Sequence, residues 1–91
     1  MKFRDKVLLE IHDAYRNCNR SYMEKVYSKW TKTENIDDYI QAVGELLDLG
    51  YLKKIKKDSY FYDGYEWDLV PEGILLTAQG IDYSEEISWA G

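Results

Sequence analysis

The chain has 91 residues, of which 45% are hydrophobic and 32% charged, and its formal net charge is −5. This length suits one domain spanning residues 1–91, and nine tyrosines with three tryptophans supply a core that excludes a disordered chain. The single cysteine, Cys18, excludes an internal disulfide and fits a buried position in a reducing compartment.

The first predicted helix runs from about residue 3 to residue 17. Apolar residues keep helical spacing along one side, and polar residues fall largely on the other. The apolar side holds Phe3, Val7, Leu8, Ile11, Tyr15 and Cys18, and the polar side holds Arg4, Asp5, His12, Asp13 and Arg16. The apolar run at 7–9 is too short for a signal peptide or a membrane span, so we expect a cytoplasmic protein outside the membrane.

A second helix is predicted from Ser21 to about Trp30. The order Ser21-Tyr22-Met23-Glu24 is typical of a helix start, because the serine hydroxyl and the glutamate carboxylate each satisfy a free backbone amide. Residues 31–33 form the turn that follows.

The third helix is expected to begin after Thr33 or Asn35 as its cap and to end at Gly50, which tolerates a left-handed backbone. Spacing predicts a buried stripe that contains Ile36, Ile40, Val43 and Leu47. The opposite side then carries Asp37, Gln41, Glu45 and Asp48. This exposed side contains three carboxylates and no cation.

A β-ribbon is predicted after the third helix. Residues 53–57 form a basic strand candidate, and Asp63-Gly64 suits a type I′ hairpin turn. This turn would place Tyr62 opposite Tyr65 and Tyr60 opposite Trp67, as a ring cluster that either covers the core or is exposed to a partner. Thr77 then caps a last helix.

The order of these elements, with L-L-D-L-G-Y-L after the third helix and L-T-A-Q-G-I-D-Y at the start of the last, resembles the winged helix-turn-helix proteins of bacteria and their phages. T-E-N-I-D-D-Y-I and the closing motif, with Leu76, Thr77, Gly80 and Tyr83, are similar to the small YjcQ-like group. The resemblance implies an α+β winged helix-turn-helix with three helices, a two- or three-stranded wing and a C-terminal helix. It also implies a regulator that binds DNA.

Catalytic and metal-binding patterns are absent from the sequence. His12 and Cys18 are six positions apart on a helix, so their side chains diverge and cannot act as base and nucleophile. There is no cysteine pair, no second histidine and no glycine-rich phosphate loop. We therefore expect no enzyme activity, no metal and no cofactor.

Two functions remain open, and the resemblance favours the first, because relatives of this shape most often bind DNA. The first is a transcriptional regulator that binds double-stranded DNA through phosphate contacts. Its candidate residues are Arg16, Arg20, Lys25, Lys29, Lys32, Lys53, Lys54, Lys56 and Lys57. Residues 58–91 contain eight acids and no base, so the overall field opposes a polyanion.

The second function is a protein-interaction module or adaptor, including a possible homodimer. Its acidic helix and aromatic ribbon would dock another protein. The candidate residues are Asp37, Gln41, Glu45, Asp48, Tyr60, Tyr62, Tyr65 and Trp67. Helix three and the predicted turn lack the arginines and lysines that read base edges or enter a minor groove, which keeps this alternative open.

Overall fold

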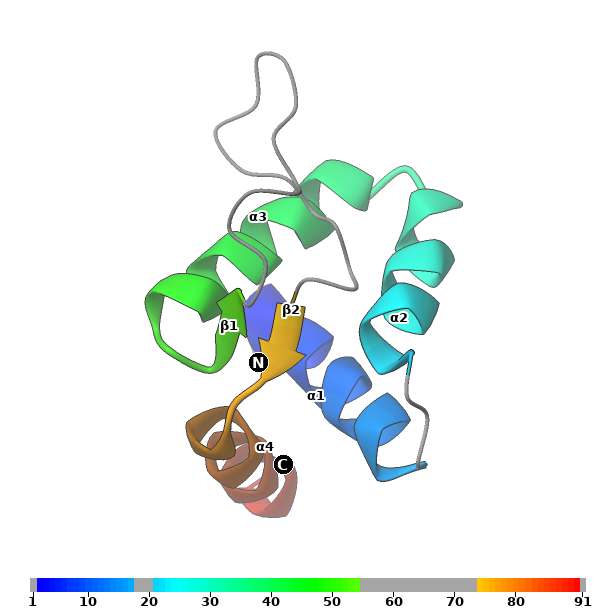
Figure 1. Ribbon diagram of the computed structural model, residues 1–91. Coiled ribbons are helices and arrows are strands. Elements are labelled where there is room, and N and C mark those ends of the chain that lie inside the picture. Colours follow the sequence, from blue (N-terminus) through cyan, green and yellow to red (C-terminus); the bar gives the residue numbers. More distant parts are fainter. Residues whose placement is uncertain (1, 18–20, 55–73, 91) are drawn as a thin grey trace.

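The computed structural model describes residues 2–17, 21–54 and 74–90 (Figure 1). These residues form an α+β arrangement of four helices and a two-stranded antiparallel sheet. In chain order the elements are α1 (Phe3–Arg16), α2 (Tyr22–Thr31), α3 (Ile36–Asp48), β1 (Leu52–Lys54), β2 (Ile74–Leu76) and α4 (Ala78–Ala90). No helix within the described ranges is long and apolar enough to cross a membrane.

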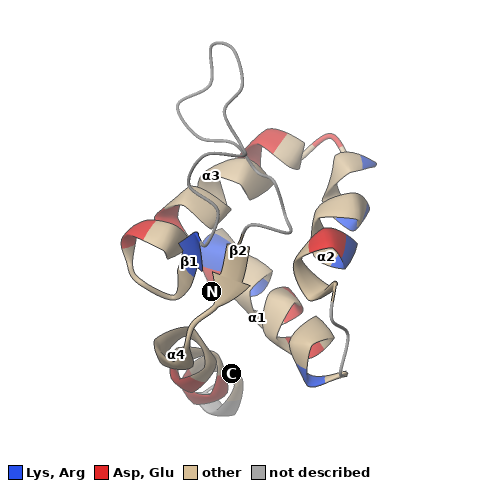
Figure 2. Ribbon diagram, in the orientation of Figure 1, with Lys and Arg blue, Asp and Glu red and all other residues tan. Residues whose placement is uncertain are grey.

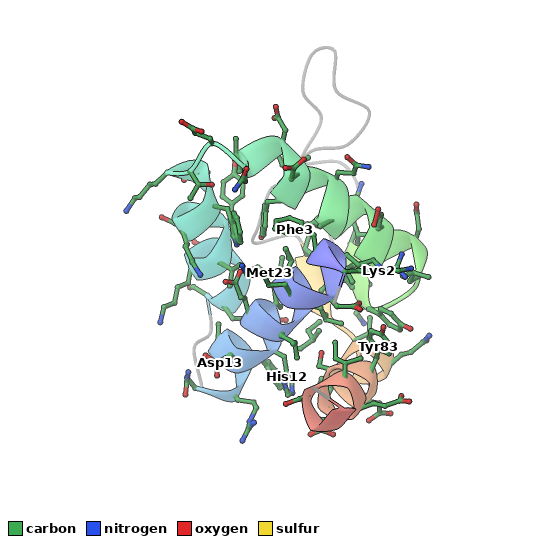
Figure 3. The ribbon with its side chains drawn as sticks, turned by 180° about the vertical axis from the view of Figure 1, so that it is seen from behind. Lys2, Phe3, His12, Asp13, Met23 and Tyr83 are labelled. Atoms are coloured by element: carbon green, nitrogen blue, oxygen red, sulfur yellow. The ribbon has the colours of Figure 1, made fainter. Side chains whose placement is uncertain are left out.

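The first helix, α1, lies at the centre, because α2, α3 and α4 each pack against it (Figure 1). Val7, Leu8 and Ile11 are fully buried, as their spacing predicts. The prediction for His12 is wrong: its side chain is only 5% exposed, and it lies on the part of α1 that faces α4 (Figure 3). Tyr15, which was expected on the apolar side, is 44% exposed.

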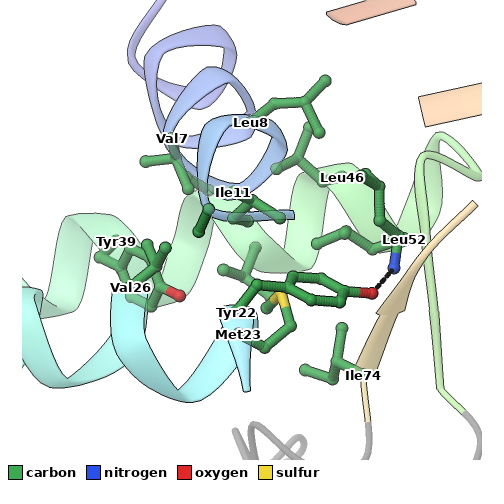
Figure 4. Packing of buried hydrophobic residues seen from close by; sticks show 14 of the residues in the cluster. Val7, Leu8, Ile11, Tyr22, Met23, Val26, Tyr39, Leu46, Leu52 and Ile74 are labelled. Carbon is green, nitrogen blue, oxygen red and sulfur yellow. Dashed lines mark hydrogen bonds between the residues drawn. The ribbon is translucent and has the colours of Figure 1, made fainter. Parts of the chain in front are cut away.

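The second helix begins after Ser21, as predicted, but its predicted cap is not formed. The Ser21 side chain makes no capping hydrogen bond, because the backbone at φ −103° and ψ 39° is not in the extended conformation usual for such a cap. The next residue, Tyr22, is buried, and its hydroxyl accepts a hydrogen bond of 2.8 Å from the amide of Leu76 in β2 (Figure 4). Burial raises the pKa of Tyr22. This tyrosine therefore joins α2 to the sheet.

The third helix has the predicted bounds, but the Asn35 side chain makes no capping hydrogen bond. The buried side of this helix is rotated from the predicted stripe. Tyr39 and Leu46 are fully buried together with Val43, whereas Ile36 and Ile40 are only half-buried. Leu47, also in the predicted stripe, is half-buried as well. The Tyr39 ring stacks on Trp30 of α2 at 5.9 Å, and this aromatic contact orients α3.

The end of α3 confirms the role predicted for Gly50. Its φ is 83°, and its amide donates a hydrogen bond of 3.1 Å to the carbonyl of Leu47. The amide of Tyr51 donates one of 3.0 Å to the carbonyl of Leu46. This pair of bonds is a Schellman motif, which satisfies the last carbonyls of the helix and turns the chain into β1.

The two strands pair in an antiparallel register that sets Leu52 opposite Leu76 and Lys54 opposite Ile74. Leu52, Ile74 and Leu76 are buried, so one face of the sheet packs on the core (Figure 4). The predicted basic strand at 53–57 thus begins one residue earlier than expected. The predicted Asp63-Gly64 turn lies outside the described residues.

Thr77 caps α4, as predicted, and also joins this helix to the end of α3. Its hydroxyl accepts a hydrogen bond of 2.9 Å from the amide of Gly80 and donates one of 2.7 Å to the carbonyl of Gly50. A Cβ on Gly80 would lie 2.2 Å from the carbonyl oxygen of Tyr51. Only glycine therefore permits this close approach of α4 to the chain that enters β1.

Candidate partner-binding surface

The outer side of α3 carries the acidic surface expected from the sequence. Asp37, Gln41 and Asp48 are exposed, and so is Asp38, which was not among the predicted site residues. Glu45 is half-buried, and its carboxylate lies 3.9 Å from the Arg4 guanidinium of α1. The exposed part of this helix thus carries three carboxylates and one amide. The Arg4–Glu45 ion pair is long and partly exposed, so it stabilises the fold little.

A groove runs between α3 and β1. It is lined by Gln41, Gly44, Leu47, Asp48, Leu52 and Lys53, together with four further residues that include Glu45. Gly44 and Leu47 are half-buried and Leu52 is buried, so apolar atoms form the floor. The α3 wall is acidic, with Glu45 and Asp48, whereas Lys53 and Lys54 place cations on the β1 wall. This surface can receive a peptide segment, because it combines an apolar floor with charged walls.

Among the described residues, the predicted nucleic-acid-binding side chains come from α1, α2, the turn after α2 and β1. Arg20, Lys56 and Lys57 lie outside the described residues. Figure 2 shows the basic residues of α2 and those of β1 apart from one another, with α3 carrying acids only. Of the remaining candidates, Arg16, Lys25, Lys29, Lys32 and Lys53 are exposed and Lys54 is half-buried. A duplex lying along α3 would therefore meet carboxylates between two small groups of cations.

Lys29 is already engaged within the fold. Its ammonium group donates to the Glu10 carboxylate of α1 and lies 5.7 Å from the centre of the Trp30 ring. The indole of Trp30 donates to the second oxygen of the same carboxylate at 2.8 Å. This contact joins α1 and α2, and it had not been predicted from the sequence. A phosphate would have to compete with Glu10 for Lys29.

Lys25 also shares its surroundings with carboxylates. A shallow groove between α1 and α2 is lined by Lys25 and Lys29 on one side and by Glu10 and Asp13 on the other. The negative charges of Glu10 and Asp13 therefore weaken the attraction of these two lysines for a phosphate. Lys32, in the turn after α2, is exposed.

The aromatic part of the predicted partner surface, Tyr60, Tyr62, Tyr65 and Trp67, lies outside the described residues. Within the described ranges, no three His, Cys, Asp or Glu side chains are grouped so that they could hold a metal ion. The chain matches no protein-family model, no curated protein and no solved structure.

Proposed function

We propose that the chain is a winged-helix domain that binds another protein through the outer side of α3 and that carries out no catalysis. The element order supports the winged-helix assignment: α2, a short turn and α3 are followed at once by a paired ribbon base, β1 and β2. In that assignment α3 occupies the position of a recognition helix.

The observation that carries the proposal is the charge of this helix. Its exposed positions are Asp37, Asp38, Gln41 and Asp48. A helix that enters the major groove meets phosphates on both sides, so carboxylates at these positions oppose binding. The same residues attract a protein surface that carries lysine or arginine.

Site-specific photo-crosslinking in cells that express the protein tests the proposal. A crosslinking amino acid at Gln41 is expected to trap a protein adduct. The same amino acid at Asp82, an exposed position of α4, serves as the matched control and is expected to trap none or a different one. If Gln41 captures only nucleic acid, or nothing, the outer side of α3 is not a protein-binding surface.

The alternative is DNA binding through phosphates, and the exposure of Lys25, Lys32 and Lys53 favours it. It predicts that the protein retards random duplex DNA at about 50 mM salt and loses this activity steeply as salt rises. It also predicts that replacement of Lys25 and Lys32 by Glu abolishes retardation. Our proposal predicts no retardation at this salt concentration by the unaltered protein.

A further inference from the structure

Gly44, in the middle of α3, has no structural explanation within the described part of the fold. Glycine is the poorest helix former after proline, and it is usually retained where φ is positive or where another group approaches closely. Gly50 is the one described glycine with a positive φ, and no atom of the described residues lies within 4 Å of the place where a Cβ on Gly44 would be. Among the described residues, nothing fills the space that a side chain at position 44 would take.

This open space lies in the groove between α3 and β1. Gly44 lines the groove beside Gln41 and Leu47, one turn away on either side, and beside Asp48. The half-buried Leu47 borders it. A partner can thus reach the backbone of α3 at Gly44 and contact apolar atoms next to it.

Asp48 in the same groove is also unfavourable for the isolated fold. It occupies the last turn of α3, which contains no basic residue. The carbonyl end of a helix carries partial negative charge, so a carboxylate there lowers helix stability. Two residues one helical turn apart in the same groove are therefore unfavourable for folding, a pattern typical of functional sites.

We propose that this groove binds an amphipathic helix of another protein, which places a small side chain over Gly44 and basic side chains along the acidic wall of α3. The charge of the walls sets the orientation, since Lys53 and Lys54 repel cations from the β1 side and Glu45 and Asp48 attract them to the α3 side. The net charge of −5 adds a field that attracts a basic partner. This inference rests on the proposed function and specifies the partner class.

The binding test uses a synthetic amphipathic helical peptide with alanine and leucine on one face and lysine along one flank, and a counterpart with glutamate in place of lysine. We expect the lysine peptide to bind and the glutamate peptide not to bind. Gly44→Leu, which fills the open space, should weaken binding at least about tenfold, a loss of about 1.4 kcal/mol. Asp48→Lys should also weaken it. Ser28→Leu, on the exposed side of α2, is the matched control and should leave the affinity unchanged.

Thermal unfolding of Gly44→Ala tests whether the space is open in the free protein. We expect the melting temperature to rise by up to about 4–8 °C, because alanine favours the helix by up to about 1 kcal/mol. A fall would mean that another part of the same chain fills this space, which overturns the inference.

Two further outcomes overturn it. One is failure of the lysine peptide to bind at about 1 mM, and the other is equal affinity for the unaltered protein and Gly44→Leu. If Gln41 still crosslinks to a protein in either case, the proposed function stands and only the assigned groove and partner class are wrong.

Discussion

Two glycines of this protein stand in opposite environments. Gly80 lies where α4 crosses the chain between α3 and β1, and an added Cβ would lie 2.2 Å from the Tyr51 carbonyl oxygen. Gly44 lies on the outer side of α3, where an added Cβ meets no described atom within 4 Å. The fold itself explains the first glycine and not the second. A residue that folding does not require is the better guide to function.

The largest effect is expected at Gly80, where α4 contacts the chain between α3 and β1. Gly80→Ala forces α4 away from Tyr51, since the contact is with backbone and not with a flexible side chain. We expect a loss of about 3 kcal/mol in the free energy of unfolding, at the upper end for overpacking of a rigid site. Denaturant unfolding measures it. Gly44→Ala is the matched control and should gain up to about 1 kcal/mol.

Equal changes in the free energy of unfolding for Gly80→Ala and Gly44→Ala would contradict the contrast between the two glycines. So would a loss at Gly44 larger than the loss at Gly80, because the outer side of α3 would then be part of the packed fold.

A smaller loss is expected from Thr77→Val. The change keeps the shape of the side chain but removes the hydroxyl that bonds to the Gly80 amide and to the Gly50 carbonyl. We expect a loss of about 1–2 kcal/mol, comparable to that of other helix caps, and a melting temperature lower by about 4–8 °C for each kcal/mol. Thr77→Ser retains the hydroxyl and should lose less. If valine and serine behave alike, the cap does not join α4 to the end of α3.

The two helix ends that meet near Gly80, the end of α3 and the start of α4, were predictable because their signals are local, but their contact was not predicted. A threonine before a helical pattern predicts a cap, and Gly50 after the last apolar residue predicts the end of α3, and both predictions are confirmed. Spacing alone did not reveal which side of α3 is buried. The ring of Tyr39 belongs to the core, and its stacking on Trp30 depends on how α2 crosses α3.

The candidate site was predictable only in part for the same reason. Charge and exposure of Asp37 and Asp48 follow from the pattern within one helix. The contacts of Lys29 with Glu10 and of Glu45 with Arg4 join residues far apart in the chain. No helical period predicts them. The open space at Gly44 likewise requires knowledge of what surrounds the helix.

Tyr39 offers a further test of the packed side of α3. Its hydroxyl is buried and has no hydrogen-bond partner among the described residues. A buried polar group without a partner is unfavourable, so Tyr39→Phe should raise the free energy of unfolding by about 1 kcal/mol at neutral pH.

The same residue predicts an alkaline effect with a definite sign. Burial, followed by the nearby Glu10 carboxylate, raises the pKa of Tyr39 above its ordinary value of 10.0. Below pH 10 the phenol is neutral in both states and stability is unaffected. Above it the unfolded chain ionises first, so stability falls by about 1.4 kcal/mol per pH unit through this group. Tyr39→Phe should lack this part of the loss when unfolding is followed from pH 9 to 11.

The smallest effects, on the outer side of α3, are opposite in sign at its two ends. Asp37 lies in the first turn, where a carboxylate favours the helix, and Asp48 lies in the last, where it does not. Asp37→Asn should lose about 0.5 kcal/mol and Asp48→Asn should gain about as much, and both changes should shrink at high salt. A loss from Asp48→Asn would give that carboxylate a role in the fold. Folding would then explain Asp48, as it explains Gly80. One of the two reasons for assigning a partner to the α3 groove would be lost.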